Sequence, residues 1–201
     1  MKNNNQSATF NKFSLLQIDF DLLSKELYTD LKIISEQIKS KDCQTWRRLY
    51  VKSILSTIES QLSFLKSHIK ITGEIDYLGL SEEEEAMIFG KKIDGKFRKL
   101  SFLENLKHTI ELFSVVNYAF LKLKKDTGMW NSLVVLVKIR NRITHPSNSS
   151  DILISDKDVK ICEQAFNYFQ DNLIILFKAC EEGLKKTKKY AEWSLEAIKK
   201  K

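Results

Sequence analysis

Residue types that could bind a phosphate and move a proton are concentrated in the segment Arg-Asn-Arg-Ile-Thr-His-Pro at 140–146. The apolar run Leu133–Val137 precedes it and predicts a helix. Since residues three or four apart share a helix face, Arg140 and Asn141 are expected to continue the inward stripe of this run, and His145 to extend it. A buried guanidinium without a partner costs several kcal/mol in order of magnitude, so Arg140 needs an anion, a carboxylate or a partner surface. Pro146 ends the helix and leaves the His145 imidazole at its end.

Guanidinium and imidazole groups at this spacing suit the chemistry of a phosphodiester. A guanidinium stays charged and offers a fork of donors to phosphate oxygens, and an imidazole gives or takes a proton near neutral pH. No His, Cys or carboxylate cluster has ligand spacing, so no metal or cofactor is expected. The structural alternative is that Arg140 pairs with a core carboxylate and His145 caps the helix end, where a cation is favourable by about 0.3–1 kcal/mol.

The elements that must position this segment are predicted to be long helices. The chain has 201 residues, of which 43% are hydrophobic and 29% charged, with 1 Pro and 6 Gly. Apolar residues recur every three or four positions from Phe13 to Ile38 and again from Trp46 to Ile69, and a linker as short as 39–42 implies an antiparallel pair. Later helices are predicted behind Ser101, over about 129–144, and from Ser155 to Leu184. Strand-like alternation is nowhere sustained, so the fold class is an all-α, antiparallel up-and-down bundle.

Residues 73–100 interrupt the helical pattern between the second and third core helices. They hold four of the six glycines. Ser81 with Glu84 forms a capping-box pattern that opens a short acidic helix reaching about Phe89, and Asp94-Gly95 is a hairpin signal. The segment is too short to bury a core of its own, so it is interpreted as an excursion. The predicted organisation is a disordered N-terminus (1–12), a single helical domain (13–184) and a basic tail (185–201).

The charge is uneven and the cysteines are few. Residues 185–201 carry seven Lys and two Glu, so a net +5 of the total +7 lies in the tail. This distribution does not favour a duplex-binding protein, although the tail could attract RNA or an acidic partner. The chain has three cysteines, an odd number, and they are far apart in the sequence: Cys43, Cys162 and Cys180. This favours reduced thiols over disulfides. No signal peptide and no run of about 18 apolar residues is present, so a soluble cytoplasmic protein with no membrane partner is expected.

The segment at 140–146, at the end of an apolar helix in a helical chain, resembles the HEPN superfamily. The motif of that family is Arg, a polar residue that is often Asn, a few further residues and His, which Arg140, Asn141 and His145 match position by position. The order of long helices resembles the family bundle over most of residues 13–184. Residues 73–100 and the basic tail match no part of the family pattern.

The resemblance implies a metal-independent endoribonuclease that acts as a homodimer, with two motifs facing each other in one composite cleft. By this analogy Arg140 holds the scissile phosphate, His145 moves a proton and Asn141 orients His145 or a phosphate oxygen. The products would carry a 2′,3′-cyclic phosphate and a 5′-hydroxyl. Such a nuclease could be the toxin of a toxin–antitoxin or antiviral defence system, with RNA as substrate and an antitoxin protein as partner.

Two other classes of protein remain open from the sequence. One is a non-catalytic HEPN-like helical dimer that binds RNA, a nucleotide or a protein partner, and the other is a purely structural oligomer. Among the remaining residues, His68 and His108 are expected at the surface or its boundary, and Glu82–Glu85 at a solvated helix start. Trp46 and Trp130 are expected in the core, whereas Trp193 in the tail is the tryptophan most suited to contact RNA.

Overall fold

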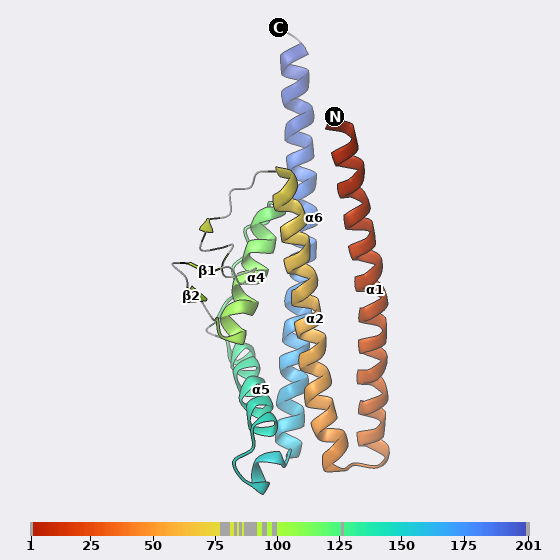
Figure 1. Ribbon diagram of the computed structural model, residues 1–201, viewed down its shortest axis with the longest axis vertical. Helices are drawn as coiled ribbons and strands as arrows, with labels where there is room; N and C mark the ends of the chain where they lie inside the picture. The colour runs from red at the N-terminus through yellow and green to blue at the C-terminus, as the bar shows by residue number, and fades with distance from the viewer. Residues whose placement is uncertain are drawn as a thin grey trace.

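The computed structural model of the chain is built from five long helices (Figure 1). The residues that the structure describes are 2–76, 81, 82, 84, 86, 92, 93, 96, 97, 100–125 and 127–199. In chain order the helices are α1 (Lys2–Ser40), α2 (Gln44–Asp76), α4 (Phe102–Val116), α5 (Gly128–Thr144) and α6 (Asp156–Lys199), with a 3₁₀ helix η1 (Ser149–Ile152) before α6. The all-α prediction is confirmed, and α5 begins one residue before the predicted start of the helix that carries the motif.

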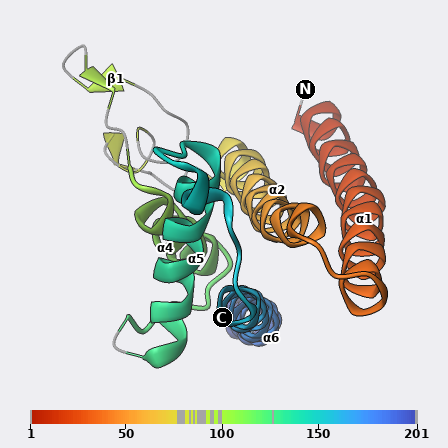
Figure 2. The same ribbon diagram turned by 90° about the horizontal axis from the view of Figure 1, so that it is seen from below.

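Helices α1 and α2 form the antiparallel pair that the short linker predicts (Figure 1). Phe20 of α1 stacks on Phe64 of α2 with ring centroids 4.0 Å apart. Seen from below, α1 lies along the side of α2 that faces away from α5 (Figure 2). Residues 2–12, for which the sequence predicted disorder, continue α1 as helix. No Pro or Gly interrupts the chain before residue 41, so nothing in the backbone chemistry stops the helix there.

Helix α4 runs in the same direction as α2, which departs from a strict up-and-down order. Phe102 at the start of α4 lies with Glu59 and Leu62 of α2 around a surface hollow, and Phe113 near its end packs on His68 further along α2. The start of α4 therefore lies beside the middle of α2. Helix α5 then runs antiparallel to α6. In Figure 1, α4 lies above α5 along the same side of the bundle.

Side-chain caps fix where the helices begin. Ser101 and Glu104 form a full capping box at α4, and Ser81 and Glu84 exchange the same two bonds in the excursion. The predicted acidic helix is described only at residues 82, 84 and 86, which are helical. Strands β1 (Lys92–Ile93) and β2 (Lys96–Phe97) pair as the predicted hairpin, whereas its turn at 94–95 lies outside the described residues.

One hydrophobic cluster joins all five helices and fixes their packing. Its fully buried members include Ile54 and Ile58 of α2, Ile110 of α4, Leu136 of α5 and Phe169 of α6. Among the described residues, no helix is long and apolar enough to cross a membrane. The C-terminal part of α6 projects beyond this core (Figure 1), so the basic tail predicted as a separate segment continues the last helix as far as Lys199.

Candidate functional site

The candidate site lies at the C-terminal end of α5, and the local sequence explains why the helix ends there. The Thr127 side chain caps the first turn by accepting a hydrogen bond from the Trp130 backbone N–H at 3.1 Å. The helix ends at Thr144, and His145 takes the C-cap position with φ −128° and ψ 63°. Pro146 has no N–H with which to continue the helix. The imidazole of His145 is thereby held at the rim of the bundle, where it is exposed.

The three motif residues are joined by short polar contacts. The Arg140 guanidinium donates to the Asn141 side-chain oxygen at 3.2 Å, and the backbone N–H of His145, at the C-cap, donates to the Asn141 backbone carbonyl at 2.9 Å. Arg140 is half-buried, whereas Asn141 and His145 are exposed. The inward stripe was predicted to continue through Arg140 and Asn141; in the structure it continues instead through Ile139 and Ile143, which are buried. The motif therefore faces solvent rather than the core.

Arg140 differs from the other arginines of this end of the bundle in what it binds. Among the described residues, no carboxylate lies within ion-pairing distance of its guanidinium, and its only hydrogen-bond acceptor is the neutral amide of Asn141. The alternative in which Arg140 pairs with a core carboxylate is therefore wrong within the part of the chain that the structure describes. The carbonyl groups at the end of a helix carry partial negative charge, which favours this cation but satisfies few of its five donors.

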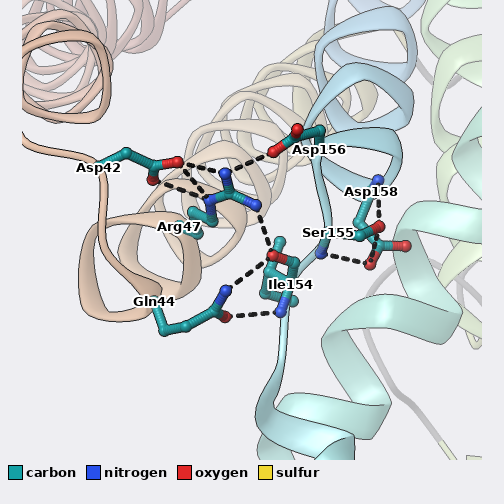
Figure 3. A network of polar contacts seen from close by, with 7 residues as sticks. All are labelled: Asp42, Gln44, Arg47, Ile154, Ser155, Asp156 and Asp158. Carbon is teal, nitrogen blue, oxygen red and sulfur yellow. Dashed lines mark hydrogen bonds and ion pairs between the residues drawn. The ribbon is translucent and has the colours of Figure 1, made fainter.

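A second polar network, around Arg47 near the start of α2, holds the segment that leads into α6 (Figure 3). Arg47 of α2 forms ion pairs with Asp42 and Asp156 and donates to the Ile154 carbonyl at 2.8 Å. The Gln44 amide donates to the same carbonyl at 3.0 Å and accepts from the Ile154 N–H at 2.7 Å. The backbone of Ile154, whose residue is 0% exposed, is thereby fully satisfied.

Arg142 belongs to this structural network rather than to the motif. Its guanidinium donates to the Leu153 carbonyl at 2.9 Å and pairs with Asp158 at 3.2 Å. Burial of the Asp158 carboxylate opposes its ionised form, but hydrogen bonds from the Ser155 backbone and hydroxyl and the charge of Arg142 outweigh burial and lower the pKa of Asp158. Asp158 therefore serves both as the capping partner of Ser155 and as the counter-ion of Arg142.

The sequence analysis did not identify the Arg47 network. Asp42 lies five residues before Arg47 across a helix start, and this spacing could have suggested the ion pair. Nothing in the local sequence points to Asp156 or Ile154, which lie more than a hundred positions away along the chain. His68, expected at the surface or its boundary, is half-buried, with its ring between those of Phe64 and Phe113.

The remaining candidates have structural explanations where they are described. Trp130 is buried as predicted and Trp46 is half-buried, whereas the Trp193 side chain lies outside the described residues. Within the described part of the chain no three His, Cys, Asp or Glu side chains come together as metal ligands. Cys162 and Cys180 are buried free thiols and Cys43 is an exposed one. Burial raises the pKa of the Cys162 thiol to about 12 and that of Cys180 to about 11.

The fold and the site together define an all-α bundle with an open Arg–Asn–His cluster at one rim. A guanidinium with unused donors and an exposed imidazole at the same helix end are groups that can bind a phosphate and transfer a proton. No known family model matches the chain, and neither a curated protein nor a solved structure does. The geometry of the site therefore carries the functional argument.

Proposed function

We propose that this chain is a metal-independent endoribonuclease of the HEPN type. The observation that carries the proposal is the contrast at the α5 terminus. Arg142 binds a carboxylate and a backbone carbonyl, whereas Arg140, two residues earlier, binds only the amide of Asn141 among the residues that the structure describes. An arginine kept half-buried without a counter-charge is suited to an anion supplied by a ligand.

In the proposed reaction RNA supplies its own nucleophile. His145, in its neutral form, takes the proton of a ribose 2′-hydroxyl, and the 2′-oxygen attacks the adjacent phosphorus. Arg140 donates to the non-bridging phosphate oxygens, on which negative charge accumulates in the transition state. The bond from phosphorus to the 5′-oxygen breaks, and that oxygen takes up a proton. The products are a 2′,3′-cyclic phosphate and a 5′-hydroxyl. Asn141, which already contacts Arg140, orients the guanidinium.

A homodimer would supply the acid and the base for this reaction. Each chain contributes one motif with one His145, whereas the reaction needs one group to take a proton and another to give one. Since the motif lies at an exposed rim of the bundle, a two-fold axis beside it would bring two copies of His145 to one cleft. A toxin of this kind would be held inactive by an antitoxin protein, which is the partner that the proposal implies.

The test is RNA cleavage by the purified full chain in the presence of a chelator. Cleavage that yields cyclic-phosphate ends is expected, and His145→Ala should abolish it. Lys138→Ala serves as the matched control, because Lys138 is exposed on the same helix outside the motif. Cleavage that survives in His145→Ala, or that requires a divalent cation, would reject the proposal.

A second candidate function is RNA binding without cleavage, and the exposed lysines of α6 favour it. Lys185, Lys186, Lys188 and Lys189 are all exposed on the part of α6 that extends past the core. Binding through these residues would weaken steeply as salt increases, because each phosphate contact releases counterions. Salt-dependent RNA binding by the wild-type chain, with no products at any salt concentration, would favour this candidate over the nuclease.

A further inference from the structure

Two adjoining apolar cavities lie at the other end of the bundle from the motif. One of about 430 Å³ is lined by α1, α2, α4 and α6 and opens to solvent, and one of about 560 Å³ lies between α1 and α2 and is also open. Gln17, Phe64 and His68 line both cavities, so the two spaces meet at these side chains. The part of α6 that lines the 430 Å³ cavity, from Phe177 to Leu184, begins about 30 Å along the helix from Asp158, at about 1.5 Å per residue. This cavity is therefore separate from the candidate nuclease site.

Aromatic rings form the walls of the 430 Å³ cavity. Phe20 and Phe64 stack on each other at 4.0 Å, and Phe113 meets Phe177 edge-on at 5.9 Å. The His68 ring lies 4.8 Å from the Phe113 ring and joins the two pairs. Side chains from four helices thus present ring faces and edges to one space, which is the arrangement that favours a flat aromatic guest.

The polar groups in this cavity are few and largely uncharged. Burial lowers the pKa of His68 and so favours the neutral imidazole, although a hydrogen bond with Asn117 opposes the effect. Asn117 is itself buried, and its side-chain amide donates to the Phe113 carbonyl at 2.8 Å. Among the described lining residues the one carboxylate is Glu181, which is exposed and paired with Lys185, and none is Lys or Arg. An anionic ligand would therefore enter without a counter-charge.

The backbone beside the cavity is held in a strained shape. Tyr118 and Phe120, which follow Asn117, have positive φ values of 60° and 53°, which is uncommon for bulky residues. Gly183 of α6 fits against this turn, since a Cβ atom there would lie 2.5 Å from the Tyr118 carbonyl oxygen. Strain of this kind persists only where surrounding packing fixes it, and it occurs preferentially around ligand sites.

We propose that this cavity is a binding site for an uncharged, mainly aromatic small molecule, with at most one polar group placed at His68 and Asn117. Its volume lies in the range of about 300–1,000 Å³ that is usual for small-molecule sites. One turn of an α-helix, about 10 Å wide and 5.4 Å long, would occupy roughly 400 Å³. The cavity thus has room for one turn, whereas a docked helix needs several.

The test uses Prodan, an uncharged naphthalene ketone whose fluorescence reports on polarity, added to the full chain. Saturable binding of one dye per chain with a blue-shifted emission is expected. Gln17→Trp should weaken the affinity by at least about tenfold, because the indole would occupy the junction of the two cavities. Leu22→Trp is the matched control: Leu22 is exposed on the same helix and lines neither cavity.

A second pair of variants guards against an effect of folding. Leu184→Trp should weaken binding as Gln17→Trp does, whereas Ile174→Trp, on α6 but outside the lining, should not. Thermal unfolding of each variant without dye should stay close to the wild type. The anionic dye anilinonaphthalene sulfonate, of similar size, should bind more weakly than Prodan. Non-saturable binding, equal affinity in both members of a pair, or tighter binding of the anion would overturn the proposal.

Discussion

Arg47 and Arg140 lie at the same end of the bundle, yet their surroundings are opposite. Arg47 reaches two carboxylates and a buried backbone carbonyl, and its side chain is 15% exposed. Arg140 reaches one neutral amide. The difference shows that carboxylates accompany the arginine that donates to a buried backbone carbonyl. The absence of one at Arg140, among the described residues, is the physical basis for expecting an external anion there.

The largest expected effect separates Arg140 from its neighbour Arg142. In Arg140→Ala, RNA cleavage should fall by at least about a hundredfold, because a donor to the transition-state phosphate is lost. Its thermal unfolding should be nearly unchanged, since no carboxylate is left unpaired. Arg142→Ala should do the reverse: it should retain cleavage and lose stability through Asp158 and the Leu153 carbonyl. Equal effects of the two changes on cleavage would remove the distinction between them.

Arg47→Ala is expected to have the largest effect on stability. The change leaves the buried Ile154 carbonyl with one donor fewer and removes both ion pairs. A loss of about 1–3 kcal/mol in the free energy of unfolding is expected from urea titration. Arg48→Ala is the control, because the Arg48 contacts are long, at 3.4 Å. A loss no greater than that of the control would mean that the network contributes little.

Gln44→Ala should have a smaller effect of the same kind. It removes both hydrogen bonds to the backbone of Ile154, while Arg47 still donates to the carbonyl. The Ile154 N–H is then the group left without a partner, which costs about 1–2 kcal/mol. Combining Gln44→Ala with Arg47→Ala should cost more than the sum of the two, since the carbonyl then loses every donor. Strict additivity would show that the two residues act independently.

The smallest expected effect concerns pH. The pKa of Asp158 lies below its ordinary value of 3.8 when the chain is folded. Its stabilising contribution is therefore complete above about pH 4 and is lost as the pH falls through the lower, folded pKa. Between about pH 5 and pH 2, Asp158→Asn should show a shallower decline in the free energy of unfolding than the wild type. Parallel curves for the two proteins would exclude Asp158 as a source of the acid sensitivity.

Periodicity and capping were sufficient to predict the helices but not their directions. The boxes at Ser101 and Ser155 marked two helix starts correctly, because each depends on residues three positions apart. The direction of α4 depends on where the chain rejoins the bundle after α2, and no local sequence pattern encodes that position. Similarly, the apolar run before Arg140 predicted α5 but not its rotation, which places Ile139 and Ile143 inward and Asn141 outward.

The candidate site was predictable only where it depends on residues that are close together in the sequence. Arg140, Asn141 and His145 lie within six positions of one another at one helix end, so the sequence predicts their shared location, and only Asn141 and His145 have the four-residue spacing of one helix face. The Arg47 network and the aromatic cavity around His68 join residues from distant helices, and a single sequence does not reveal such contacts. What distinguishes Arg140 from Arg142 is the position of Asp158, which only the packing of α5 on α6 determines.

Because α6 is unbroken, it fixes the distance that an RNA bound at both ends of the helix would have to span. Asp158 sits beside the motif and Lys185 begins the lysine-rich stretch, 27 residues later on one helix, which corresponds to about 40 Å. A strand touching both ends of one protomer must extend over that span, so very short oligonucleotides can engage only one end. Longer RNAs would then make additional, salt-sensitive contacts with the lysine-rich stretch that short ones cannot make.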